Sequence, residues 1–241
     1  GGMFAAFLYL TIYIQGVLGY SPLDAGLRFL PLTLLSFFVA PISGKLSHRV
    51  PVRVLMGIGL AMVGVGLMLM RGVTVDSDWT TLLVGFLVAG AGIGLTNPGI
   101  AQAAIAVVEP ARAGMASGIN TTFRQVGIAT GVAGLGAVFQ SRIDSKFAAL
   151  MPNAQHGLSE AVASGGSVAA GRVARPGIHH QVVVDAKIAF VGAFNDILLI
   201  AAVIAFVGAA LGFLLVRDRD FLAVPGQEVA PPDEAAEPVA A

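Results

Sequence analysis

The stretch from Ala113 to Phe139, AGMASGINTTFRQVGIATGVAGLGAVF, decides how the rest of the chain is interpreted. It is long enough to cross a bilayer as one helix, yet it carries a full positive charge at Arg124. A charged side chain at that depth costs roughly 2.5–3.5 kcal/mol on insertion scales, so we expect the guanidinium to face protein or a wet cavity. At about 100° per residue, Arg124 shares one stripe with Asn120, Gly127 and Gly131. The sequence therefore predicts a helix whose polar, small-residue face meets a partner surface and lines a polar path.

The composition is that of a polytopic membrane protein. Hydrophobic residues make up 56% of the 241 positions, charged residues only 12%, and the mean hydropathy is +0.84. A soluble domain carries about a quarter charged residues. The net charge is zero and no basic tract is present, which argues against a nucleic-acid partner. The chain has no cysteine and its four histidines lack zinc-site spacing, so we expect neither a metal nor another cofactor.

Six apolar runs of spanning length follow one another along the chain. They cover roughly residues 3–18, 25–46, 54–70, 79–107, 113–139 and 188–216. Pro31 and Pro41 lie inside the second run and predict a bend there. Residues 140–187 are polar, small and glycine-rich, which predicts a long loop with one short surface helix near 158–163. The chain thus predicts an all-α membrane protein in which residues 1–216 form one six-helix domain, followed by a disordered tail over 217–241.

Positive charges in the short connections give the expected orientation. Lys45, Arg49, Arg53 and Arg112 all fall on one side of the predicted membrane by parity, whereas the other side has only Arg71 in a short connection. Such an excess marks the cytoplasmic side. Both ends of the six-helix segment, and the tail, are therefore expected in the cytoplasm, with the long polar loop on the other side.

Three phrases, taken in order, resemble one family of transporters. They are GYSPLDAGL followed by LP (residues 19–31), GKLSHRVPVR (44–53), and the segment from AGMASG to RQVG (113–127). Together they resemble the fourteen-helix drug:proton antiporter branch of the major facilitator superfamily, and the long polar loop before the last run fits that branch too. The resemblance implies that the six runs are the C-terminal bundle of that fold, without its N-terminal half. It also implies a plasma-membrane location, in particular a bacterial inner membrane.

The second phrase is similar to the superfamily's cytoplasmic loop motif, G-x-L-[AS]-D-R-x-G-R-[RK]. Gly44, Arg49 and Arg53 occupy motif positions, whereas His48 and Pro51 stand where Asp and Gly are usual. The resemblance therefore implies a cytoplasmic connection here, but it does not carry over the charge relay that the missing Asp serves.

In superfamily geometry, the first, second, fourth and fifth helices of a half face the central cavity. The resemblance therefore implies six polar side chains as substrate-path candidates: Gln15, Asn97, Gln102, Asn120, Arg124 and Gln125. Two interpretations of Arg124 stay open. It attracts an anionic group or a carboxylate of the other half, or it is structural and bonds helix-end carbonyls or snorkels to the cytoplasmic surface. For Asn120 and the other amides, hydrogen bonding between helices is the commoner role.

Asp196 is the one carboxylate clearly inside a predicted span, and an embedded acid is a candidate proton carrier. It lies about two turns from the outer end of its helix, which the resemblance places at the periphery of the bundle. An interfacial carboxylate capped by Asn195 or by solvent is the favoured alternative. Asp196 is therefore a weak candidate for proton coupling.

The resemblance implies the C-terminal half of a secondary transporter that works by alternating access. It would export amphipathic or cationic small molecules against an inward flow of protons, in a lipid bilayer and together with its N-terminal half. The alternative is a six-helix membrane interaction or assembly subunit without transport of its own, which glycine-rich faces suit equally well. No nucleophile–base pair or metal set appears within the spans, so an enzyme is not expected. The opening Gly1-Gly2-Met3, already inside an apolar run, indicates a fragment, with a start at Met3 as the alternative.

Overall fold

A computed structural model describes residues 2–47, 49–106, 110–151, 157–174 and 177–216, and every element within these ranges is helical. The side chains of residues 101–110 lie outside the described part. The elements are α1 (Gly2–Ile12), a π-helical turn η1 (Tyr13–Val17), α2 (Pro22–Arg28), α3 (Leu30–Leu46), α4 (Val52–Leu69), η2 (Trp79–Leu82), α5 (Leu83–Ala106), η3 (Pro110–Arg112), α6 (Ala113–Leu150), α7 (Leu158–Val173) and α8 (His179–Leu215).

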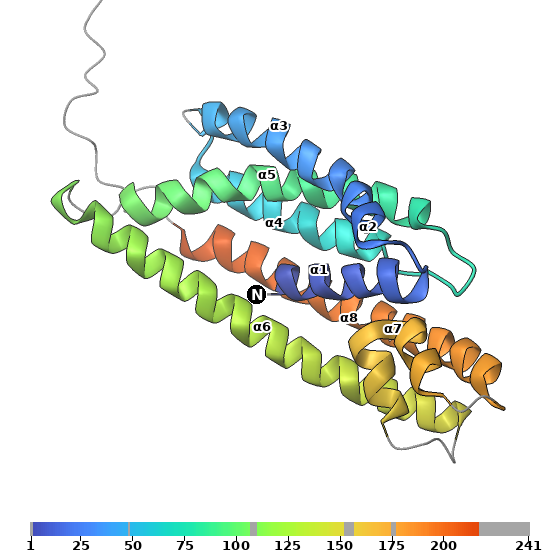
Figure 1. The fold of residues 1–241 in the computed structure, drawn as a ribbon. Coiled ribbons are helices and arrows are strands. Elements are labelled where there is room, and N and C mark those ends of the chain that lie inside the picture. Colours follow the sequence, from blue (N-terminus) through green and yellow to red (C-terminus); the bar gives the residue numbers. More distant parts are fainter. Residues whose placement is uncertain (1, 48, 107–109, 152–156, 175–176, 217–241) are drawn as a thin grey trace, which may run out of the picture.

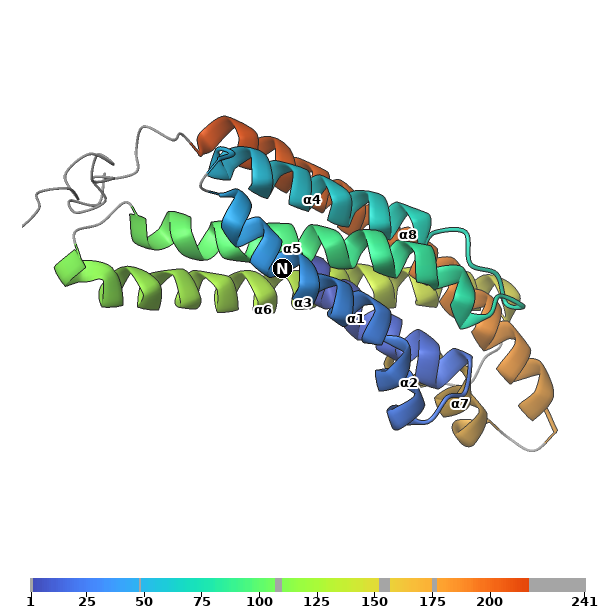
Figure 2. The ribbon, with the colours of Figure 1, turned by 90° about the horizontal axis from the view of Figure 1, so that it is seen from above.

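The long helices run roughly along one common axis and give the molecule two ends (Figures 1 and 2). One end carries the turns 18–21 and 70–78 together with α7, and we call it the α7 end. The opposite end carries the 47–51 turn and the start of α6. This alternation of connections between two ends is the up-and-down topology that the apolar runs predict.

The number of predicted spans is only partly confirmed. Four helices are long and apolar enough to cross a membrane, namely α4, the η2–α5 segment, α6 and α8. The α2–α3 pair makes a fifth span if its bent halves are counted as one. The remaining apolar helix, Phe4–Val17, is shorter than the spanning length, so six spans are not confirmed.

The predicted bend in the second run is present. The axes of α2 and α3 differ by 41°, and the break falls at Phe29, just before Pro31 in the first turn of α3. Proline has no N–H to donate to the preceding turn, and it disfavours helical geometry in the residue before it. Pro41 lies inside α3 and does not divide it. Pro31 therefore lies just after the break between two helices, whereas α3 continues through Pro41.

The prediction of a long loop over 140–187 is wrong. α6 continues to Leu150, α7 occupies Leu158–Val173, and α8 already begins at His179. α7 is more than a surface helix, because Leu158, Val162 and Ala170 are fully buried. Its packing on α6 and α8 extends the hydrophobic core of the bundle into this polar segment.

α7 also docks on the π-helical turn η1 through glycine. Gly166 has a left-handed φ of 66° and divides α7 at a kink, where its Cα lies against the backbone of Gly16. The buried hydroxyl of Ser167 donates a 3.0 Å hydrogen bond to the Gly16 carbonyl. A side chain at either glycine would meet the other backbone, so this contact requires glycine on both sides.

Candidate functional site

A cavity of about 450 Å³ opens between α1, α3, α4, α5 and α6. Its volume is in the range of small-molecule sites. Most of its wall is apolar, with these residues: Phe4, Phe7, Leu32, Leu60, Val63, Ile93, Ile100 and Ile128. The polar part of the wall is formed by Thr33, Ser36, Thr96, Asn97 and Arg124. Few polar groups on an apolar wall suit an amphipathic ligand, which they can orient while hydrophobic contact supplies affinity.

Two of the predicted candidates meet in this cavity. Asn97 comes from α5 and Arg124 from the first half of α6, and both side chains are exposed. Thr96, their neighbour in the wall, is buried and donates its hydroxyl to the Gly92 carbonyl at 2.8 Å. Within the described ranges, neither a hydrogen bond nor an ion pair engages the guanidinium of Arg124. Arg124 and Asn97 are therefore the two predicted candidates that this cavity offers to a ligand or to a partner, beside the hydroxyls of Thr33 and Ser36.

Three of the other candidates lie outside this wall. Asn120 is half-buried one turn before Arg124, and Gln125 is exposed beside it. Gln15 is half-buried in η1, near α7 rather than near the cavity. Gln102 belongs to α5, but its side chain lies outside the described residues. The structure thus brings together two of the six residues.

The sequence also left out most of the cavity wall. Phe4 and Phe7 of α1 share a helical face, as do Ile93, Asn97 and Ile100 of α5. The spacing of the α5 residues around the predicted Asn97 was a signal for two more wall residues. Nothing comparable identified Phe4 and Phe7, because an apolar residue on a membrane helix serves a cavity, a core or lipid equally well.

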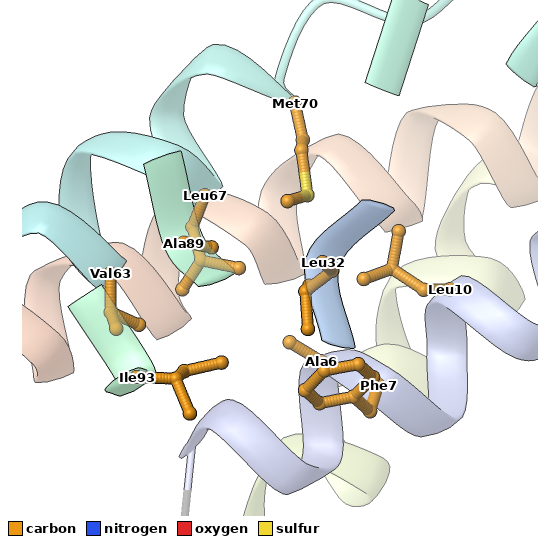
Figure 3. Close-up of a pocket in the computed structure, with 9 residues that line it drawn as sticks. All are labelled: Ala6, Phe7, Leu10, Leu32, Val63, Leu67, Met70, Ala89 and Ile93. Carbon is orange, nitrogen blue, oxygen red and sulfur yellow. The ribbon is translucent and has the colours of Figure 1, made fainter. Parts of the chain in front are cut away.

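A second, much smaller space lies beside this cavity on the side of the α7 end, and we call it the narrow extension because the two share wall residues. It has a volume of about 10 Å³ and shares Phe7, Leu32, Val63 and Ile93 with the larger space. Figure 3 shows its nine lining residues, all apolar: Ala6, Phe7, Leu10, Leu32, Val63, Leu67, Met70, Ala89 and Ile93. The space between the helices is therefore much smaller on the α7 side of the cavity, and we call this narrowing the pinch.

The first half of α6 is mostly open. At Gly114, Gly118 and Gly127 an added Cβ atom would have nothing within 4 Å. Large apolar side chains are exposed on the same stretch, and Phe123 has 73% of its surface accessible. In Figure 1 this half of α6 runs along the margin of the molecule. Gly127 of the stripe, and Gly114 and Gly118 on the other side of the helix, thus have no close contact with the helices that the structure describes, whereas Arg124 of the same stripe lines the cavity.

The second half of α6 is anchored instead. Leu135, Phe139, Ile143 and Phe147 are buried at four-residue intervals. Phe139 contacts Tyr9 of α1 and Phe190 of α8, with ring centroids 4.2 and 5.1 Å apart. α6 therefore has one half that belongs to the bundle and one half that projects beside it.

Asp196, the weak proton-coupling candidate, forms ion pairs with α6. Its Oδ2 lies 3.5 Å from Lys146 Nζ and 3.9 Å from Arg142 Nε, and its side chain is 31% exposed. Asn195 does not cap it but binds the connection after α4, accepting from Gly72 N at 2.8 Å and donating to Val73 O at 2.9 Å. Both residues thus link α8 to neighbouring elements.

The loop-motif residues lie at the end opposite α7. Gly44 is half-buried in the last turn of α3, Arg49 is exposed in the turn, and Arg53 is exposed at the start of α4. His48 lies outside the described residues. The two arginines are placed as an exposed basic connection requires.

Comparison with known families identifies the class of protein. The model of the Major Facilitator Superfamily matches residues 1–132, which include η1, the broken second span, both cavity candidates and the open stripe of α6. The chain belongs to this superfamily of membrane transporters.

Similar proteins are named for drug resistance. The chain is 36% identical over 136 residues to the multidrug resistance protein Stp of Mycobacterium tuberculosis, which covers 56% of this chain and 25% of that protein. It is 35% identical over 171 residues to the puromycin resistance protein pur8 of Streptomyces alboniger, covering 69% and 33%. With the multidrug efflux pump LfrA of Mycolicibacterium smegmatis it shares 28% over 214 residues, covering 87% and 42%. The chain thus spans less than half the length of each of these relatives.

Proposed function

We propose that this chain is the C-terminal half of a secondary transporter that exports amphipathic or cationic small molecules by proton antiport with alternating access. Membership of the superfamily and the drug-resistance relatives support export. The cavity supports amphipathic substrates, because its apolar wall tolerates varied shapes and its few polar groups discriminate weakly among them.

The membrane arrangement proposed here keeps six spans. Phe4–Val17 is the first, although at about 1.5 Å per residue it is shorter than a hydrocarbon core of about 30 Å. α2 with α3 forms the second, and residues 1–216 form one six-helix lobe with the long connection of α7 outside the membrane. Both ends of this lobe and residues 217–241 lie in the cytoplasm of a bacterial cell, in accord with Lys45, Arg49 and Arg53 at the end opposite α7.

The observation that carries the proposal is the open face of α6. Arg124 lines the cavity from a half-helix on which an added Cβ atom at Gly114, Gly118 or Gly127 would meet nothing within 4 Å. An unpaired cation and a small-residue stripe in a membrane require a partner surface, and an N-terminal half would supply it. Arg124 then contacts either an anionic group of the substrate or a carboxylate of that half.

The test is drug export by the complete gene product. Everted membrane vesicles are energised with a proton gradient, and ethidium serves as the amphipathic cationic probe. We expect export that collapses when an ionophore removes the gradient. Arg124→Ala should lower the rate by about tenfold or more, which corresponds to at least ~1.4 kcal/mol.

Two control variants give this test its resolution. Arg124→Lys keeps the charge but loses the planar donor fork, and it should retain an intermediate rate. Phe123→Ala changes the adjacent residue, which lies outside the cavity wall, and should leave export unchanged. Absence of gradient-driven export by the unaltered protein would favour an interaction or assembly subunit, and equal rates for both alanine variants would remove Arg124 from the site.

A further inference from the structure

The break between α2 and α3 lies close to the narrow extension, which Leu32 of α3 lines. We call this break the joint. α2 has only seven residues and is fixed at its start, where Ser21 accepts from Asp24 N at 3.2 Å and Pro22 occupies the first turn. It ends at Arg28, and after the 41° bend α3 starts at Leu30 with Pro31 in its first turn. Arg28 and Phe29 therefore lie at the pivot, where the backbone must change when α2 alters its angle to α3.

Phe29 closes the path from the cavity toward the α7 end. Its ring lies between those of Phe7 and Phe86, with centroids 5.7 and 5.4 Å away. Phe7 lines both the main cavity and its narrow extension, and Phe86 is fully buried in α5. Leu32, one turn after Phe29, lines the same narrow extension (Figure 3). The three rings thus join α1, the helix break and α5 directly beyond the pinch.

Arg28 forms a second layer beyond this aromatic one. Its guanidinium carbon lies 3.4 Å from the centroid of the Tyr20 ring and 5.5 Å from that of Trp79. Nη1 donates to the Asp24 carbonyl at 2.9 Å and lies 3.8 Å from the Asp24 carboxylate. Nε is buried and has no hydrogen-bond partner among the described residues, and the side chain is only 19% exposed. The two ring faces therefore provide much of what holds this cation in place.

We infer that Phe29 and Arg28 form a two-layer gate at the α7 end of the cavity, with Phe29 as the plug and Arg28 as the latch. A change of angle at the joint would alter the backbone at Arg28 and Phe29 and turn both side chains away from their ring contacts, while α3 keeps its packing on α5. Tyr20 and Trp79 belong to the α1–α2 turn and to η2, so the latch ties α2 to the elements on either side of the path. The inference rests on the proposed transport function for its purpose, but the closure itself is a property that can be measured without transport.

The test uses the absence of cysteine from this chain. Leu32→Cys places one reporter thiol below the plug, in the complete gene product with any cysteine elsewhere replaced. A membrane-impermeant maleimide is added to intact cells, which exposes one side of the membrane, and to everted vesicles, which exposes the other. We expect slow labelling from the side of the α7 end.

Phe29→Ala should raise that labelling rate by about tenfold, as expected when roughly 1.4 kcal/mol of closing free energy is lost. Phe29→Leu keeps much of the bulk and should raise it less. Arg28→Gln should also raise it, and Arg28→Lys should fall in between. Phe38→Ala removes a ring of α3 that is 63% exposed and should leave the rate unchanged.

The outcomes separate this inference from the proposed function. Equal rates for the unaltered reporter, Phe29→Ala and Arg28→Gln would overturn the gate, whether or not the protein exports ethidium. Faster labelling with Phe29→Ala in a protein that exports nothing would support the gate and refute the transporter. If Phe29→Ala fails to reach the membrane, Phe29→Leu takes its place, and Arg28→Lys likewise replaces Arg28→Gln. Each replacement should raise the labelling rate by a smaller factor.

Discussion

The glycines of α4 and α5 and those of the first half of α6 have opposite surroundings. At Gly92 of α5, an added Cβ atom would lie 2.5 Å from the Gly59 carbonyl and 2.8 Å from Val63 N. At Gly66 of α4 it would lie 2.7 Å from Ala89 N. At Gly118 and Gly127 of α6 it would meet nothing within 4 Å. The same small residue thus closes one helix interface and leaves another surface open.

Glycine spacing alone therefore does not identify the partner of a membrane helix. Small residues let two backbones approach, and in α4 and α5 the partner is in the same chain. In α6 the spacing is similar, but no described helix occupies the face. The proposal of a second transporter half rests on this contrast.

The largest effect is expected from Gly92→Val. The added side chain would be forced against the backbone of α4, and overpacking of this kind costs about 1–3 kcal/mol, occasionally more. Gly127→Val is the matched control, because its side chain would enter open space. Thermal unfolding of the purified proteins in detergent should show a clear loss for the first variant and little change for the second. Equal losses would mean that the two faces do not differ.

Gly127→Leu should separate folding from function. We expect normal stability of this chain but about tenfold slower ethidium export, because a bulky residue would keep a partner surface from approaching, and this change corresponds to ~1.4 kcal/mol. Export is measured in everted vesicles beside Phe123→Leu, a substitution on the large apolar face of the same helix. If both variants export at the normal rate, the stripe does not contact a partner.

The sequence predicted the membrane-spanning helices better than the polar segment over 140–187. Apolar run length located α4, α5 and α8, and Pro31 predicted the broken second span. Hydropathy failed over 140–187, because it detects lipid-crossing segments and this stretch is helical without being apolar. A different signal was available there: Leu135, Phe139, Ile143 and Phe147 recur every four residues, which indicates a helix with one buried face.

The candidate site could be predicted only in part. Arg124 and Asn97 stand out because a charge or an amide in an apolar run needs a polar environment, and the structure places both in one cavity. Gln15 satisfies the same criterion but lies in η1, the turn that packs against α7. Apolar wall residues such as Phe7 carry no mark in the sequence that distinguishes a cavity from lipid.

A moderate effect is expected from Ser43→Ala. The buried Ser43 hydroxyl donates to the Leu95 carbonyl at 2.8 Å and so joins α3 to α5. Hydrogen bonds between membrane helices average about 0.6 kcal/mol, with a maximum near 1.7, so we expect a loss of that order. Ser47→Ala is the control, because the Ser47 hydroxyl donates to the Gly44 carbonyl in the last turn of the same helix. Chemical denaturation in detergent compares the two, and an equal loss would contradict an interhelical role.

The smallest effect on stability is expected from Asp196→Asn. The side chains of Lys146 and Arg142, which form ion pairs with Asp196, are 39% and 56% exposed. Ion pairs as exposed as these contribute about 0–1 kcal/mol to stability. Asp144→Asn, which alters a contact within α6, is the control. Proton uptake coupled to export should persist in both variants. Loss of coupling in Asp196→Asn alone would instead make Asp196 a proton carrier.

The central claim is that the polar stripe of α6 faces a partner while its large apolar face meets lipid. Spin labels placed singly at Asn120, Gly127, Ile119 and Phe123 of the complete gene product, in lipid vesicles, test it directly through collision with oxygen and with a polar nickel chelate. The account predicts frequent oxygen collision at Ile119 and Phe123, and at Asn120 and Gly127 either access to the chelate or protection from both reagents. Equal, lipid-like oxygen collision at all four positions would contradict it.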